Sequence, residues 1–184
     1  MQWRWLSQEI AYTGCELRSG WIADTAGLEG EALVAFIGPC EVSLAHMVDT
    51  EDVARGIPIK AAQMLHFLAE HFDTELAHTV LRQRLLVCRA AEILNQTSRH
   101  PIHRDGDDLF AEGRKLSVSV ATASPVSTLI HLGLNINPSG APVPAIGLDE
   151  LGVSAAQVAK QIMAAYIEEM RSCQAACSKV RRVP

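Results

Sequence analysis

The sequence lacks the features that would mark a secreted or membrane protein. No run of eighteen apolar residues occurs, and residues 1–9 contain no apolar core of the kind that signal peptides have. We therefore expect no membrane partner and a cytoplasmic location. The 184 residues are 48% hydrophobic, which suits a single domain over residues 1–184 that buries its core without metal or disulfide support.

Cysteine pairs and an excess of basic residues are also missing. The five cysteines contain no Cys-x-x-Cys pair, so neither a disulfide framework nor a zinc ribbon is indicated. Cys173 and Cys177 lie four positions apart, but two thiolates alone do not close a zinc site. The formal net charge of −5 argues against a nucleic-acid partner, because such proteins usually carry a basic surface. The short basic cluster at residues 179–182 is typical of a solvated tail.

Several catalytic signatures do not occur. The chain has no Gly-x-Ser-x-Gly motif, no P-loop and no Rossmann glycine pattern, so those classes of enzyme have no support. His66 is followed by Glu70 and His71, which differs from the His-Glu-x-x-His motif of zinc proteases. A metal held by His66 and Glu70 with other elements stays an alternative to a histidine at the edge of the core.

The hydrophobic pattern predicts an α+β fold with a mainly antiparallel sheet packed against helices. We expect strands at 10–17 and 31–37, a loop with one helical turn at 47–59, helices at 61–72 and 74–95, an exit loop at 98–106, a hairpin of 116–120 with 128–136, and a long helix after Ser154. The helix at 61–72 rests on helical spacing of Ala61, Met64, Leu65, Leu68 and Phe72. The expected inward residues of the next helix are Leu81, Leu85, Cys88 and Ala91.

The predicted hairpin concentrates the polar chemistry of the chain. With a turn centred on Pro125, antiparallel pairing would align one polar face of the two strands, and a slip of one residue would break this arrangement. The expected neighbours are Lys115 with Asn135, Ser117 with Gly133, and Ser119 with His131.

Each of these side chains has a functional and a structural interpretation. Lys115 can hold a carboxylate or phosphate, or it can simply pair with Asp107 or Asp108. His131 suits ligand contact or acid–base catalysis, and a hydrogen bond to Ser119 is the alternative. Gly133 inside a strand indicates close approach by a ligand, a bulge or a tightly packed helix.

The residues around the hairpin resemble the central motif of the biotin and lipoate protein ligase catalytic domain, which is class II synthetase-like. The matching residues are Asp108-Leu109-Phe110, Arg114-Lys115-Leu116 and Gly133-Leu134-Asn135-Ile136. Over its full length the chain also resembles a small uncharacterised family, domain of unknown function 366. That second resemblance implies a fold and no reaction.

The ligase resemblance implies ATP-dependent formation of an acyl-adenylate from a small carboxylic acid of the biotin or lipoate type, with a lysine of an acceptor protein as a further partner. It implies that Lys115 is the electrostatic catalyst. His131 is a further catalytic candidate because of its neighbours on the strand face, and not because of the resemblance. It implies that Asp108, with Asp107 beside it, serves Mg²⁺ or the acceptor. Asn135 would contact the nucleotide or Mg²⁺, with Ser117 and Gly133 beside it.

The chain also departs from the ligases. Asp105-Gly106-Asp107-Asp108 stands where they have Trp-Pro-Asn-Asp, and their glycine- and arginine-rich adenylate loop has no clear counterpart. The nearest candidate is Glu16–Trp21, whose Arg18, Ser19 and Trp21 would contact the nucleotide, although Arg18 equally fits a structural role. A non-catalytic binding protein on the same scaffold is therefore the alternative. A homo-oligomeric or partner-binding protein, the third class, would need a broad exposed apolar surface.

Overall fold

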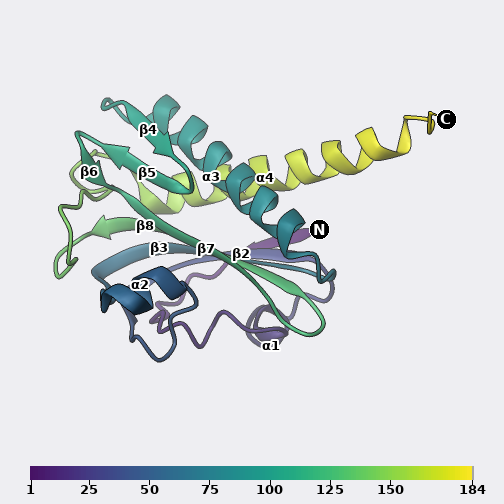
Figure 1. The fold of residues 1–184 in the computed structure, drawn as a ribbon. Helices are drawn as coiled ribbons and strands as arrows, with labels where there is room; N and C mark the ends of the chain where they lie inside the picture. The colour runs from purple at the N-terminus through teal and green to yellow at the C-terminus, as the bar shows by residue number, and fades with distance from the viewer. Residues whose placement is uncertain (184) are drawn as a thin grey trace.

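A five-stranded sheet forms the centre of the computed structural model, which describes residues 1–183 (Figure 1). Its strand order is β1 (Gln2–Trp5), β2 (Ala32–Val42), β3 (Ile59–His71), β8 (Thr128–Asn137) and β7 (Ser117–Ala123). β1 runs parallel to β2, and every other neighbouring pair is antiparallel. A second antiparallel sheet contains β4 (Ile102–Asp105), β5 (Asp108–Ala111) and β6 (Arg114–Lys115). The expected α+β class is confirmed.

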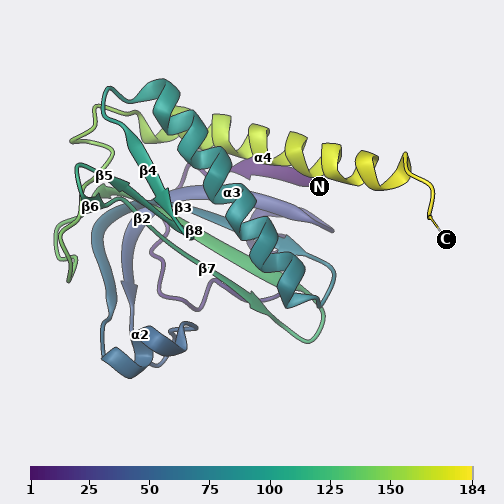
Figure 2. The same cartoon turned by 45° about the horizontal axis from the view of Figure 1, so that its top comes forward.

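Different elements cover the two faces of the large sheet. The long helices α3 (Leu76–Thr97) and α4 (Ala155–Ser178) cross one face, and the end of α4 extends past the sheet (Figure 1). The N-terminal segment with α1 (Trp21–Ala26) lies on the opposite face (Figure 1), and so does α2 (Thr50–Arg55), which Figure 2 shows from a second side. The central strands are therefore enclosed from both sides.

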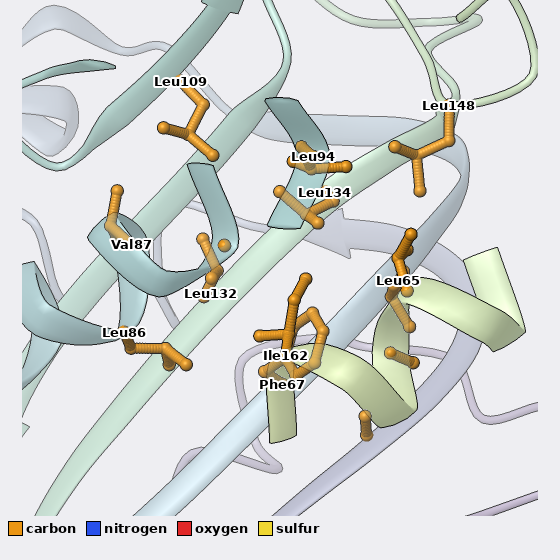
Figure 3. Packing of buried hydrophobic residues seen from close by; sticks show 14 of the residues in the cluster. Leu65, Phe67, Leu86, Val87, Leu94, Leu109, Leu132, Leu134, Leu148 and Ile162 are labelled. Atoms are coloured by element: carbon orange, nitrogen blue, oxygen red, sulfur yellow. The ribbon is translucent and has the colours of Figure 1, made fainter. Parts of the chain in front are cut away.

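Two hydrophobic clusters result from this layering. On the helix side, Phe67 of β3 and Leu132 of β8 pack with Leu86 of α3 and Ile162 of α4, all with no exposed surface (Figure 3). On the other side, Val34, Phe36, Met64 and Leu68 pack against residues of the N-terminal segment that include Leu17 and Ile22. This double burial explains why the central strands are apolar along both of their faces.

The helix expected at 61–72 is wrong, because these residues form β3. Every residue from Met64 to His71 is buried, including the polar His66, Glu70 and His71, so the alternation typical of a strand is lost and the spacing of the apolar residues fits a helix face by coincidence. The strand expected at 10–17 is also wrong: Tyr12 makes one isolated bridge to Cys40, and the rest of this range is irregular. The loop expected at 98–106 contains β4.

Other elements agree more closely with the sequence pattern. The strand at 31–37 exists and continues past Gly38 through a bulge to Val42. The helical turn around Glu51 is α2, capped by the Asp49 side chain. The helix at 74–95 is confirmed as α3 with a different inward face, since Leu81 is 67% exposed. The residues of α3 that enter the core are Leu86, Val87, Ala90 and Leu94.

The structure also bears on membrane association. Within residues 1–183, each helix is too short or too polar to traverse a lipid bilayer.

Gly38 offers a test of how closely the N-terminal segment packs on the sheet. A Cβ atom at this position would overlap the backbone carbonyl of Ile10. We expect Gly38→Ala to lower the free energy of unfolding by about 2 kcal/mol or more, as overpacking does. Gly113→Ala is the control, because a Cβ there meets open space and only its positive φ of 71° opposes the change. Equal losses for both variants in urea denaturation would contradict this packing.

Candidate functional site

Lys115 lies where the two sheets meet. It ends β6 in the small sheet, and after the fully buried Leu116 the chain enters β7 of the large sheet. The Lys115 backbone donates to Pro144 O over 3.0 Å and accepts from Ile146 N over 3.0 Å. Asn135 Nδ2 donates to its carbonyl oxygen over 3.2 Å. The backbone of this lysine is thus fixed from both sides.

The Lys115 ammonium group pairs with Asp108. Its Nζ lies 2.8 Å from Asp108 Oδ2, and the two side chains are only 30% and 27% exposed. Burial raises the pKa of the Asp108 carboxyl despite the opposing effect of Lys115, and the charges of Asp107 and Asp52 raise it further. The pairing anticipated from sequence exists, but it is half-buried, and both residues line a cavity.

Two cavities share this lysine. The first has a volume of about 230 Å³, and its lining includes Tyr12, His131 and residues 107–108. Five carboxylates line it against two fixed cations, so we call it the acidic cavity: Asp49, Glu51, Asp52, Asp107 and Asp108, against Arg55 and Lys115. The second has about 210 Å³ and one carboxylate against three cations, and we call it the basic cavity: Asp52, against Arg55, Lys60 and Lys115. Asn135 and Ser117 belong to the lining of the basic cavity.

Asp107 is held by α3 on the other side of the hairpin. Its Oδ1 lies 2.6 Å from Arg84 Nη1, and its Oδ2 accepts from Gln83 Nε2 over 3.0 Å. No group of three potential metal ligands among His, Cys, Asp and Glu occurs within residues 1–183. Mg²⁺ bound mainly through phosphates commonly uses only one or two carboxylates. Asp107 and Asp108 are groups of this type, and both already pair with cations, Arg84 and Lys115.

The expected hairpin exists, but its register differs by one residue. β7 and β8 pair Val118 with Gly133 and Val120 with His131. The expected pairs Ser117–Gly133 and Ser119–His131 are therefore wrong. The cause is the turn: Ser124 N donates to Ser127 O over 2.7 Å, which centres the turn between Pro125 and Val126 instead of on Pro125.

The two serines of β7 therefore have structural partners. Ser117 Oγ accepts from Leu109 N over 2.7 Å, which ties the small sheet to the large one. Ser119 Oγ accepts from Gln83 Nε2 over 2.7 Å and donates to the Asp107 carbonyl oxygen over 3.1 Å. These bonds fix the segment that carries Asp107 and Asp108.

A stack of buried rings forms the floor of the acidic cavity. The Tyr12 ring lies 3.9 Å from the His131 ring, and His66 Nδ1 lies 3.1 Å from His131 Nε2. His66 Nε2 is 3.3 Å from Gly38 O. Burial lowers the pKa of His66 to about 4 and also lowers that of His131, so both imidazoles are neutral near pH 7. Sequence reasoning missed this pair, because it placed His66 on a helix.

Glu70 joins the N-terminal segment to the sheet. This carboxylate, 2% exposed, accepts hydrogen bonds from Ser19 Oγ, Gly20 N and Ser127 Oγ at 2.8, 3.1 and 2.7 Å. Since its oxygens already accept these bonds, the structure gives no support to a metal held by His66 and Glu70. Of the expected adenylate-loop residues, Ser19 belongs to this cluster. Arg18 pairs with Asp24 at the surface, and the Trp21 ring packs 5.7 Å from Phe36.

Gly133 makes room for side chains of the protein itself. A Cβ here would approach the end of Met64, the His131 ring and Val118.

The structure brings Lys115, Asp107, Asp108 and His131 to one cavity, and Lys115, Ser117 and Asn135 to its neighbour.

Comparison with known proteins gives a family and a fold. The model of the family described as "Domain of unknown function (DUF366)" matches residues 1–181. A solved "Protein of Unknown Function from Pyrococcus horikoshi" is 38% identical with a TM-score of 0.93, covering 99% of this chain and 100% of that one.

More distant structures are ligases. The biotin protein ligase from Aquifex aeolicus in complex with biotin and ATP is 14% identical with a TM-score of 0.61, covering 91% of this chain and 70% of that one. A lipoate-protein ligase A bound with ATP is 14% identical with a TM-score of 0.55, covering 93% and 86%. At such identities the likeness shows a ligase-like fold alone, and it confirms the fold expected from the motifs.

The Glu70 cluster should hold the N-terminal segment in place. Glu70→Gln replaces an acceptor by an amide that faces three donors, and we expect a loss of roughly 1 to 3 kcal/mol in unfolding free energy. Glu41→Gln is the control, because Glu41 is an exposed partner of Lys60 and should change stability little. Urea denaturation measures both, and a Glu70→Gln variant as stable as the control would refute the role of the cluster.

The neutral state of His66 predicts a pH dependence of stability. Its pKa falls from 6.5 to about 4 on folding, so between these values the unfolded chain binds more protons than the folded one. Unfolding free energy should therefore decrease as pH falls through this window, by up to about 3 kcal/mol from this group. His66→Gln cannot titrate, so its stability should fall less than that of the wild type over the same range. Identical pH profiles would contradict the assignment.

Proposed function

This chain belongs to the DUF366 family, and we propose that it is an ATP-dependent ligase or acyltransferase that forms an acyl-adenylate from a small carboxylic acid. One observation carries the proposal: Lys115, a half-buried cation, lines two adjacent cavities of different charge. Adenylate formation needs a fixed positive charge at the point where a carboxylate meets an α-phosphate. The biotin and lipoate ligases of similar fold, solved with biotin or ATP, support this class of reaction.

The basic cavity is the proposed site of the nucleotide. Arg55, Lys60 and Lys115 surround it, and Asn135 adds an amide within its lining. Phosphate oxygens are stabilised by such cations. Ile57, Pro58 and Val143 supply apolar surface in the same lining, which suits the flat face of a base. ATP is thus the proposed second substrate.

The acidic cavity is the proposed site of the carboxylic acid, with its carboxylate directed to Lys115. A carboxylate oxygen attacks the α-phosphorus of ATP, the bond from that phosphorus to the bridging oxygen breaks, and pyrophosphate leaves. Lys115 stabilises the negative charge on the α-phosphate in the transition state, an effect on the order of 3 kcal/mol. Asp107 and Asp108 would hold Mg²⁺, which supplies further charge neutralisation at the phosphates.

The second half of the reaction transfers the acyl group to an acceptor, for which a lysine amine of a protein is proposed. The amine attacks the acyl carbon, the carbon–oxygen bond to AMP breaks, and the amine loses a proton. Asp108 suits the receipt of this proton, because burial raises the pKa of its carboxyl above the usual value. His131, neutral at the floor of the cavity, is the second candidate.

A non-catalytic binding protein is the second candidate function. One observation favours it. Arg18 lies in the segment that is the nearest counterpart of the ligase adenylate loop, and it pairs with the exposed Asp24. Ser19, from the same loop, bonds to Glu70. Such a protein would bind acid or nucleotide at the same two cavities and release no pyrophosphate.

Exchange of labelled pyrophosphate into ATP tests the proposal directly. We expect acid-dependent exchange with Mg²⁺ present, in a panel that includes biotin, lipoate, octanoate and amino acids. Lys115→Ala should reduce the rate by about 10²-fold or more, since it removes the charge at the reacting phosphate.

Lys160→Ala is the control, because Lys160 is an exposed residue of α4. It should retain the wild-type rate and the same melting temperature. Exchange that survives in Lys115→Ala would refute the role of this lysine. Binding of acid and ATP without any exchange would leave only the second candidate function.

A further inference from the structure

Hydrogen bonding fixes the tautomers of the buried histidine pair. Gly38 O can only accept, so His66 Nε2, 3.3 Å away, carries a hydrogen. In the neutral ring, His66 Nδ1 then has a lone pair and accepts from His131 Nε2–H over 3.1 Å. The remaining nitrogen, His131 Nδ1, must therefore be unprotonated and can act only as an acceptor.

This acceptor has no hydrogen-bond partner within residues 1–183, and its ring belongs to the lining of the acidic cavity. His131 is 3% exposed and belongs to the cavity lining. Nδ1 of His131 is also not among the fully buried side-chain nitrogens without a partner in this part of the chain, so some of its surface is accessible. A ligand group that satisfies it must donate a hydrogen.

The carboxylates around the cavity also favour a ligand group that donates a hydrogen bond. Arg84 neutralises Asp107 from outside the cavity, and Lys115 neutralises Asp108. Arg55, the only fixed cation left among the lining residues, pairs with Glu51 over 3.2 Å and lies 3.9 Å from Asp52. With five carboxylates against two cations, the lining keeps a surplus of negative charge beside the half-buried Asp108, and an added positive charge is stabilised there.

We propose that the acid bound in the acidic cavity is a zwitterion, a small amino acid whose carboxylate meets Lys115 and whose ammonium group meets Asp108 and the acceptor nitrogen of His131. The Lys115–Asp108 ion pair, both members of which line this cavity, offers a cation and an anion 2.8 Å apart. A ligand that carries both charges can pair with Lys115 through its carboxylate and with Asp108 through its ammonium group, so neither buried charge is left unpaired. This inference rests on the proposed function only in assigning the acid to this cavity.

The proposal separates this chain from ligases of neutral-chain acids. Biotin, lipoate and octanoate carry a carboxylate and no cation, so they would leave the surplus carboxylates and the His131 acceptor unsatisfied. The volume of about 230 Å³ also suits a small compound, below the range of about 300 to 1,000 Å³ common for drug-sized ligands.

Calorimetric titration with matched compounds tests the charge requirement. The panel contains the twenty standard amino acids, β-alanine and 4-aminobutyrate, each compared with the acid that lacks the amino group and the amine that lacks the carboxyl group. At least one amino acid should bind roughly tenfold or more tightly than both of its matched compounds. A plain acid or plain amine that binds as tightly as its amino-acid counterpart, or no binding by any amino acid, would overturn the proposal.

Variants locate the site of binding. Asp108→Asn and His131→Phe should each weaken amino-acid binding by about tenfold or more, since each removes a partner of the ammonium group. Asp52→Asn, on the short helix α2, is a third variant that leaves the sheet unaltered in case the first two fail to fold. Asp149→Asn is the control, because it makes the same charge change at an exposed residue between β8 and α4. Unchanged affinity in all three cavity variants would refute the location.

The outcome also separates this inference from the proposed function. Pyrophosphate exchange with biotin or lipoate, but no binding of amino acids, would overturn the zwitterion and leave the ligase reaction standing. Amino-acid binding that depends on Asp108, but no exchange, would retain the inferred ligand and reject the reaction. Nitrogen-15 NMR of the histidine rings gives an independent readout: a protonated Nδ1 on His131 in the free protein would contradict the derived tautomer.

Discussion

Burial of the large sheet from both sides is the constraint on which the rest of this structure depends. With α3 and α4 on one face and the N-terminal segment on the other, polar groups on the central strands cannot reach bulk water. They must bond to one another, because an unpaired buried polar group is costly. His66 with His131, and Glu70 with Ser19 and Ser127, are the consequences. The polar floor of the acidic cavity follows from the same constraint.

How much of this was predictable from the sequence depends on how local each feature is. The hairpin, α3 and α4 follow from periodicity within each segment. β3 was not predictable this way, because a strand buried on both faces loses the alternation that marks a strand. The hairpin register depended on one turn hydrogen bond between Ser124 and Ser127, which no pattern of hydrophobic residues encodes.

The candidate site shows the same division. The motif around Asp108 and Lys115 was recognisable, because these residues are close in sequence, and the structure brings them to 2.8 Å. The His66–His131 contact was not recognisable, since it joins residues 65 positions apart and required β3 to be a strand. The role of Glu70 likewise became visible only once Ser19 and Ser127 were placed beside it. Long-range pairing, rather than residue type, set the limit.

Five residues line both cavities: Asp52, Arg55, Ile59, Lys115 and Val118. Asp52 and Arg55 belong to α2, a helix of six residues with no buried side chain, so little packing holds this part of the shared wall in one position. If a ligand in one cavity changes the affinity of the other cavity through this wall, a ligand in the second cavity changes the affinity of the first by the same factor. Linkage between two binding sites is symmetric in free energy. The free energy of the protein with both cavities occupied therefore does not depend on which ligand binds first.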